Sequence, residues 1–116
     1  MEALDRLRAH AAGRIVEIAK AKKAGTKVIG MTPGGFCPEE MVYAAGAIPL
    51  ILGKGGDPEP CTESLTYAPR FMCAWCRSQI GYLMMGEAAE YKLPDLMVVP
   101  IVDVNIKVVA YGYDYY

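Results

Sequence analysis

Three short apolar runs of strand length alternate with segments of helical pattern, and this alternation limits the fold more than any other feature of the chain. The runs are Lys27–Met31, Ile48–Leu52 and Leu96–Val99, and glycine or proline lies close to both ends of each. Strands separated by helices pair in parallel, because a helical crossover returns the chain to the same end of the sheet. The sequence therefore predicts an α/β fold, with a short parallel sheet flanked by helices.

Helical patterns fill the segments between the predicted strands. Residues 1–24 repeat leucine, isoleucine and alanine at spacings of three and four, as an amphipathic helix does. A second helix is predicted over residues 38–46, where a proline and two glutamates suit the helix start. A third is predicted after Pro69, or from residue 64 at the earliest, up to residue 86. Residues 103–111 fit a strand through their β-branched side chains, with a helix as the alternative.

Composition narrows the classes of function. The chain has 116 residues, 53% hydrophobic and 22% charged, which predicts one globular α/β domain over residues 1–116. A net charge of −1 argues against a nucleic-acid partner. No apolar run is long enough to span a bilayer, and the charged N-terminus does not resemble an export signal, so we expect a cytoplasmic protein without a membrane partner. Four cysteines in such a chain favour metal, redox or core roles over disulfides.

Cys73 and Cys76 form a CxxC motif within the third predicted helix. Thiolates three residues apart share a helix face and can hold zinc or an iron–sulfur cluster. A thioredoxin-type redox role requires the motif at a helix N-terminus after a strand, and Pro69 and Arg70 ahead of it argue against that position. Packing of two small side chains in the core is the remaining alternative.

The carboxyl ends of the predicted strands are the expected place for a site, since parallel α/β sheets collect ligands there. Here that edge comprises the loops at Cys37, at residues 53–60 and at Val102–Asp103. Cys37 lies between a strand and a helix N-terminus, where the dipole and free N–H groups favour its thiolate. The loop residue Cys61 is a further candidate ligand, although a cysteine without a ligand role is the simpler interpretation.

Three stretches together resemble one protein family. They are residues 25–30, residues 36–49, and residues 68–73 with 77–81. The Pro-Glu-Glu and Ala-Ala-Gly-Ala-Ile-Pro pattern of the second stretch is the most specific part. In order and spacing, from about residue 15 to residue 110, they are similar to the iron–sulfur subunits of the 2-hydroxyacyl-CoA dehydratase and benzoyl-CoA reductase family. Family subunits are longer, so the resemblance implies a Rossmann- or flavodoxin-like half that is the first domain of a two-domain subunit, and it implies a helix over residues 103–111.

The resemblance also implies an enzyme that works within a complex, as a dehydratase (a lyase) or as a reductase (an oxidoreductase). Family subunits hold a 4Fe–4S type cluster on cysteines from the loop before the Pro-Glu-Glu helix, from a later helix and from a Cys-Asp after the third strand. An ATP-dependent activator supplies low-potential electrons, a paired subunit completes the oligomer, and a CoA thioester becomes a radical. By position the ligands would be Cys37 and Cys73, with Cys76, or else Cys61, in the third place.

Two positions depart from the family pattern. Cys37 directly precedes Pro38, whereas many members carry the loop cysteine several residues earlier, where this chain has a glycine. The second departure lies after the third strand. Val102–Asp103 stands where the resemblance leads us to expect Cys-Asp, and a valine side chain cannot bind iron. Two interpretations follow: an iron–sulfur subunit in which another cysteine substitutes, or a clusterless, divergent member that acts as a structural partner subunit. The number of cysteines favours the first interpretation, and Val102 favours the second.

Overall fold

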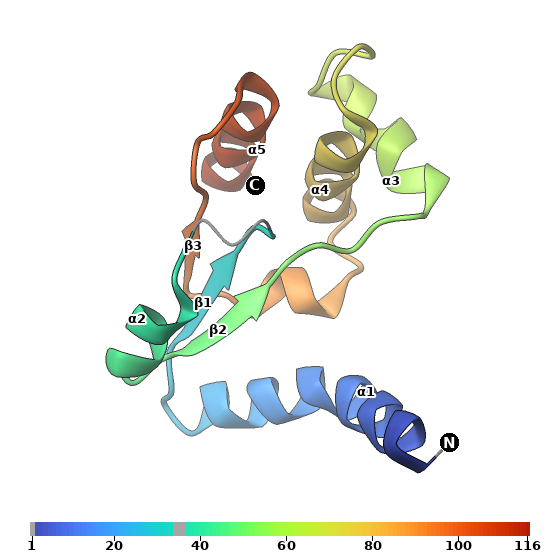
Figure 1. Cartoon of the computed structure of the whole chain (residues 1–116). Coiled ribbons are helices and arrows are strands. Elements are labelled where there is room, and N and C mark those ends of the chain that lie inside the picture. The colour runs from blue at the N-terminus through green and yellow to red at the C-terminus, as the bar shows by residue number, and fades with distance from the viewer. Residues whose placement is uncertain (1, 34–36) are drawn as a thin grey trace.

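Three parallel strands form one sheet in the middle of the structure (Figure 1). The computed structural model describes residues 2–33 and 37–116; Met1 and residues 34–36, which fall in the segment before Cys37 that was predicted as a loop, lie outside the described part. β1 (Val28–Met31) lies between β2 (Ile48–Ile51) and β3 (Leu96–Val98), so the strand order is β2-β1-β3. Both pairings are parallel. The predicted α/β fold with a short parallel sheet is confirmed.

Helices surround this sheet, and the first two begin where the sequence predicts. The helices of the described part are α1 (Glu2–Lys23), α2 (Glu39–Ala44), α3 (Pro58–Glu63), η1 (Ser64–Thr66), α4 (Ala74–Met85), η2 (Ala89–Lys92) and α5 (Val104–Tyr115). α1 matches the prediction, and α2 begins one residue after Pro38, which is its N-cap. Within residues 2–33 and 37–116, no helix combines the length and the apolarity that a bilayer crossing requires.

Two sequence-based boundaries and one element type were wrong. The segment predicted as a loop through residue 60 turns helical at Pro58, since proline suits a first helical turn. The third predicted helix starts only at Ala74, because the Cys73 N–H donates to the Asn105 side chain (3.2 Å) instead of to a preceding helical carbonyl. The strand interpretation of residues 103–111 fails because the Asp103 carboxylate caps a helix there, accepting from the N–H groups of Asn105 (2.6 Å) and Ile106 (3.1 Å).

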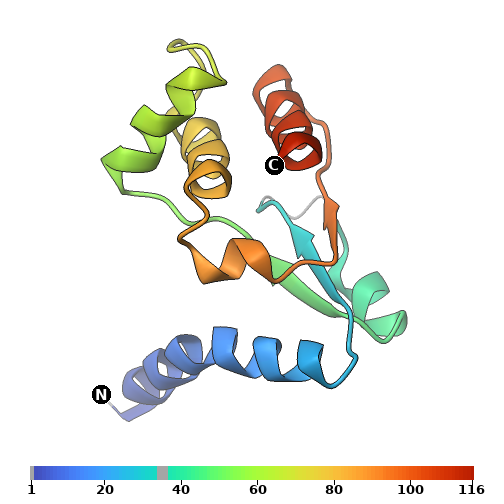
Figure 2. The ribbon, with the colours of Figure 1, turned by 180° about the vertical axis from the view of Figure 1, so that it is seen from behind.

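Successive side chains of the strands point to opposite faces of the sheet and pack in two separate cores. On one face Val28 and Leu50 pack with Ile18 of α1 and Tyr91 of η2. On the other face Met31 packs with residues of α2. A third core joins α4 and α5 beyond the carboxyl ends of the strands, as both ribbon views show (Figure 2). The α4–α5 pair therefore stands over the edge of the sheet where the candidate ligands were predicted.

Asp95 joins three elements at the opposite, amino-terminal end of the sheet. Its carboxylate accepts from the Val28 N–H (2.9 Å) and lies 3.4 Å from the Lys22 ammonium and 3.7 Å from that of Lys27. The Val28 N–H, followed by the two lysines, holds the pKa of Asp95 below its usual range. This carboxylate connects the end of α1, the start of β1 and the entry to β3.

Candidate functional site

Cys73 and Cys76 occupy the first turn of α4, and their environments differ. Cys73 is the N-cap residue with an exposed side chain, whereas Cys76 is only 3% exposed. The backbone N–H of Cys76, helped by that of Trp75, stabilises the Cys73 thiolate and lowers the pKa of that thiol. Burial, together with the neighbouring Cys73, raises the pKa of Cys76 to about 12. The motif therefore combines one exposed thiol with one buried thiol.

The connection from β3 to α5 lies beside Cys73. The Cys73 N–H donates to the Asn105 Oδ1 atom, and the negative charge of Asp103 acts on both thiols of the motif. Val102, next to Asp103, is 54% exposed. Two of the three places that the family resemblance assigns to ligands, the Cys73 helix and the Val102–Asp103 position, are thus neighbours in the fold, although 29 residues separate Cys73 from Val102 in the sequence.

Cys37 lies on the α2 face of the sheet. It is half-buried and packs against the core of Met31, Val42 and Ala47, as does Val98, the last residue of β3. α2 follows it directly and has only six residues, so the dipole that acts on this thiol is small. Over the described ranges, no three His, Cys, Asp or Glu side chains gather closely enough to hold a metal ion.

Cys61 lies on α3 and not in a loop. Its thiol donates to the Ala74 carbonyl oxygen at 3.2 Å, at the first turn of α4. Its backbone carbonyl accepts from the Ser64 hydroxyl (2.9 Å) and from the Arg77 guanidinium (3.4 Å). Cys61 therefore joins α3 to α4 through its thiol and its backbone carbonyl.

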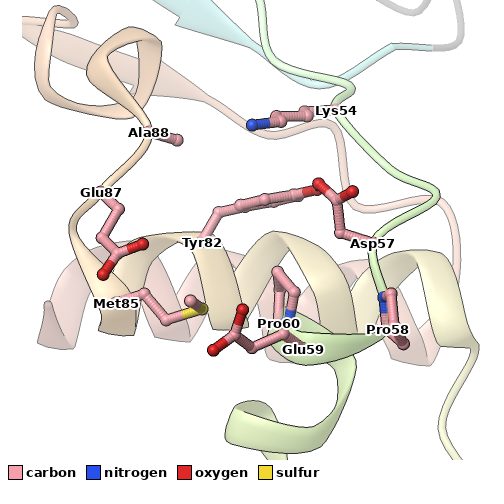
Figure 3. A pocket seen from close by; sticks show the side chains of 9 residues that line it. All are labelled: Lys54, Asp57, Pro58, Glu59, Pro60, Tyr82, Met85, Glu87 and Ala88. Carbon is pink, nitrogen blue, oxygen red and sulfur yellow. The ribbon is translucent and has the colours of Figure 1, made fainter.

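Sequence reasoning missed a pocket of about 420 Å³ between α3 and the C-terminal half of α4 (Figure 3). Its lining residues are Lys54, Asp57, Pro58, Glu59, Pro60, Tyr82, Met85, Glu87 and Ala88. The Tyr82 hydroxyl donates to the Asp57 carboxylate (2.6 Å), and the Lys54 ammonium lies 4.9 Å from the centre of the Tyr82 ring. Burial and then Asp57 raise the pKa of Tyr82 to about 12. Only the predicted ligand-collecting loop at residues 53–60 pointed towards this place.

The buried side-chain amide of Gln79 supports one wall of this pocket. Gln79 is fully buried, and its Nε2 atom donates to the Lys54 carbonyl oxygen at 2.7 Å. The Tyr91 hydroxyl donates to the Gln79 Oε1 atom. Burial raises the pKa of Tyr91, so this hydroxyl keeps its proton. Since buried polar groups are costly without partners, this chain of hydrogen bonds fixes the β2–α3 connection on α4.

Comparisons with known proteins match the part of the chain that contains these candidate residues. The model of the family described as 2-hydroxyglutaryl-CoA dehydratase, D-component, matches residues 35–109, a range that includes Cys37, Cys73 and Val102. The beta subunit of (R)-2-hydroxyglutaryl-CoA dehydratase from Acidaminococcus fermentans is 37% identical over 70 residues, which are 60% of this chain and 18% of that relative. The match thus spans under a fifth of the relative's length. No solved structure matches the chain. Because the family match covers well over half of its residues, this chain belongs to the 2-hydroxyglutaryl-CoA dehydratase D-component family.

Proposed function

We propose that this chain is the N-terminal α/β unit of a subunit in a 2-hydroxyacyl-CoA dehydratase-type complex, and that Cys73 and Cys37 are ligands of an iron–sulfur cluster. The observation that carries the proposal is the exposed Cys73 thiol at the start of α4, beside the Val102–Asp103 position. The Cys73 N–H donates a hydrogen bond to Asn105 at the start of α5, and Cys37 and Val98 pack against the same core. Family membership supports the dehydratase assignment.

The thiols of this chain fit a shared cluster to different degrees. A cysteine must lose its proton to bind iron, so Cys73, which is exposed and has a lowered pKa, is the better ligand of the motif. Cys76 is less suitable because its pKa is raised to about 12. Val102 offers no donor atom. The described residues therefore fit a cluster that is held only in part by this chain.

The remaining parts of the proposal follow the family resemblance. A paired subunit completes the oligomer in the cytoplasm, and an ATP-dependent activator delivers electrons. When bound, the cluster supplies single low-potential electrons to an acyl-CoA thioester. Two residues of this chain act on the thiols of the motif. Asn105 orients the backbone at Cys73, and Asp103 places a negative charge beside both thiols.

Anaerobic reconstitution of the 116-residue chain with ferrous iron and sulfide tests the cluster assignment. Iron and sulfide per chain, together with the visible absorption of thiolate-bound iron, are the measurements. We expect Cys73→Ser and Cys37→Ser to lose bound iron, whereas Cys61→Ser, a matched control whose thiol serves α3–α4 packing, retains it. Val102→Cys is the sharpest variant, since it adds a thiol at an exposed position beside Asp103, and we expect it to raise the bound iron.

Val102 and the lack of a three-ligand group in the described ranges favour a second candidate function, a clusterless partner subunit. In that case the wild-type chain and Val102→Cys both stay colourless after reconstitution. The chain would still form a stable complex with a paired family subunit, as measured by size-exclusion chromatography. Iron that binds equally to the wild type and to Cys73→Ser would contradict the ligand assignment itself.

A further inference from the structure

The CxxC motif spans the start of α4, with Cys73 as the N-cap residue and Cys76 as the third residue of the helix. This position meets one of the two requirements stated for a thioredoxin-type role, the helix N-terminus, although the element before the motif is η1 and not a strand. One sulfur faces solvent, while the other is buried in the α4–α5 core. Exposed and buried thiols in one helical turn are the arrangement in which one cysteine exchanges with external disulfides and the second completes the reaction.

The helix start also brings the two side chains towards one another. Cys73 has non-helical backbone angles (φ −48°, ψ 130°), as an N-cap residue does. At a helix start the side chains of the N-cap residue and of the third helical residue are neighbours, as in the capping box. Here the third residue is Cys76. Cysteines with Cβ atoms about 3.5–4.5 Å apart can form a disulfide.

The other two cysteines have different surroundings. The Cys61 thiol is engaged with the Ala74 carbonyl oxygen, and Cys37 packs in the core on the α2 face of the sheet. Neither shares the first turn of α4 with the motif. Among the four cysteines of the chain, the fold thus singles out Cys73 and Cys76 as the pair for an intramolecular reaction.

We propose that Cys73 and Cys76 form a reversible dithiol–disulfide pair that exchanges with small disulfides such as glutathione disulfide. The Cys73 sulfur attacks one sulfur of the small disulfide, forms a mixed disulfide and releases one small thiol. The Cys76 sulfur then attacks the Cys73 sulfur and releases the second small thiol. The two protons of the dithiol leave with the two released thiols, so the protein loses two electrons and the small disulfide gains them.

This inference does not depend on bound iron, but it has a consequence for the proposed function. A disulfide at this position engages the sulfur of Cys73, so that it is no longer free to bind a metal ion. Oxidation would therefore withdraw one of the two proposed iron ligands, and reduction would restore it.

Tryptic cleavage after Arg70 and Arg77 allows a direct test, because the peptide of residues 71–77 contains both cysteines and separates them from Cys37 and Cys61. The reduced chain is incubated with glutathione disulfide, quenched in acid, alkylated and analysed by mass spectrometry. We expect the 71–77 peptide to be lighter by two hydrogens and to escape alkylation, while Cys37 and Cys61 are alkylated. Cys76→Ser should stop at a chain that carries one glutathione on Cys73.

Cys61→Ser is the matched control and should oxidise as the wild type does. Full alkylation of Cys73 and Cys76 after exposure to glutathione disulfide would overturn the inference, as would a Cys73 disulfide with Cys61 or with a second chain. A Cys76→Ser chain without glutathione on Cys73 would overturn the assigned order of attack. Iron-free protein is used throughout, so a failed reconstitution would count against the proposed function and leave this result unaffected.

Discussion

Replacing Gly81 by alanine tests the packing of α3 on α4, which forms one wall of the Tyr82 pocket. A methyl group at this position would lie 1.9 Å from the Pro60 carbonyl oxygen and 2.4 Å from its carbon. Both are backbone atoms, so no side-chain rotation can relieve the contact. α3 must retreat by about 1.5 Å to reach ordinary contact distance, and a gap of that size removes much of the dispersion energy between packed surfaces.

The size of the effect follows from three contributions. Overpacking of a close contact costs about 3 kcal/mol at the upper end of the usual range, because the obstacle is rigid backbone. Movement of α3 also strains the hydrogen bond from Tyr82 to Asp57, which is worth about 1–2 kcal/mol. Alanine in a helix interior returns about 1 kcal/mol relative to glycine. We expect Gly81→Ala to lower the free energy of unfolding by about 3 kcal/mol.

Gly13→Ala is the matched control, since Gly13 is also inside a helix but has nothing within 4 Å of the added methyl group. That change should stabilise the chain by about 0.5–1 kcal/mol. Urea unfolding followed by circular dichroism measures both variants, and the Gly81→Ala midpoint should fall by about 1–2 M. A Gly81→Ala chain that unfolds at or above the wild-type midpoint, with Gly13→Ala stabilised, would refute the close packing of the two helices.

Three further predictions concern stability. Ile80→Ala removes a fully buried side chain from the α4–α5 core and should cost about 2–5 kcal/mol in chemical denaturation, unlike a change at an exposed position of the same helix. The Val28 N–H holds the pKa of Asp95 below its usual range, so the ionised carboxylate stabilises the fold at neutral pH, and this stabilisation is lost as the pH falls through the lowered pKa. The melting temperatures of the wild type and Asp95→Asn should therefore converge towards acid pH. A difference that stays constant with pH would contradict this prediction. Tyr91→Phe leaves the Gln79 oxygen without its donor and should cost about 1–3 kcal/mol, with exchange of the Gln79 side-chain amide protons, followed by NMR, speeding up.

Much of the fold could be read from the sequence. The strands, the first two helices and the parallel pairing follow from local patterns of apolar residues, because a strand repeats every two residues and a helix every 3.6. The resemblance that led to the family also depends on local motifs, above all the pattern that follows Cys37. These features need no knowledge of which distant segments meet.

Tertiary contacts decided the rest. The start of α4 at Ala74, and with it the position of the CxxC motif, depends on Asn105, which lies more than thirty residues away in the sequence. Residues 104–115 form a helix although their β-branched residues favour a strand, because Asp103 caps them and their apolar face packs on α4. The Tyr82 pocket joins Asp57 to a side chain 25 residues further on. Local periodicity carries no information about such partners, since they become neighbours only when α3, α4 and α5 pack beyond the edge of the sheet.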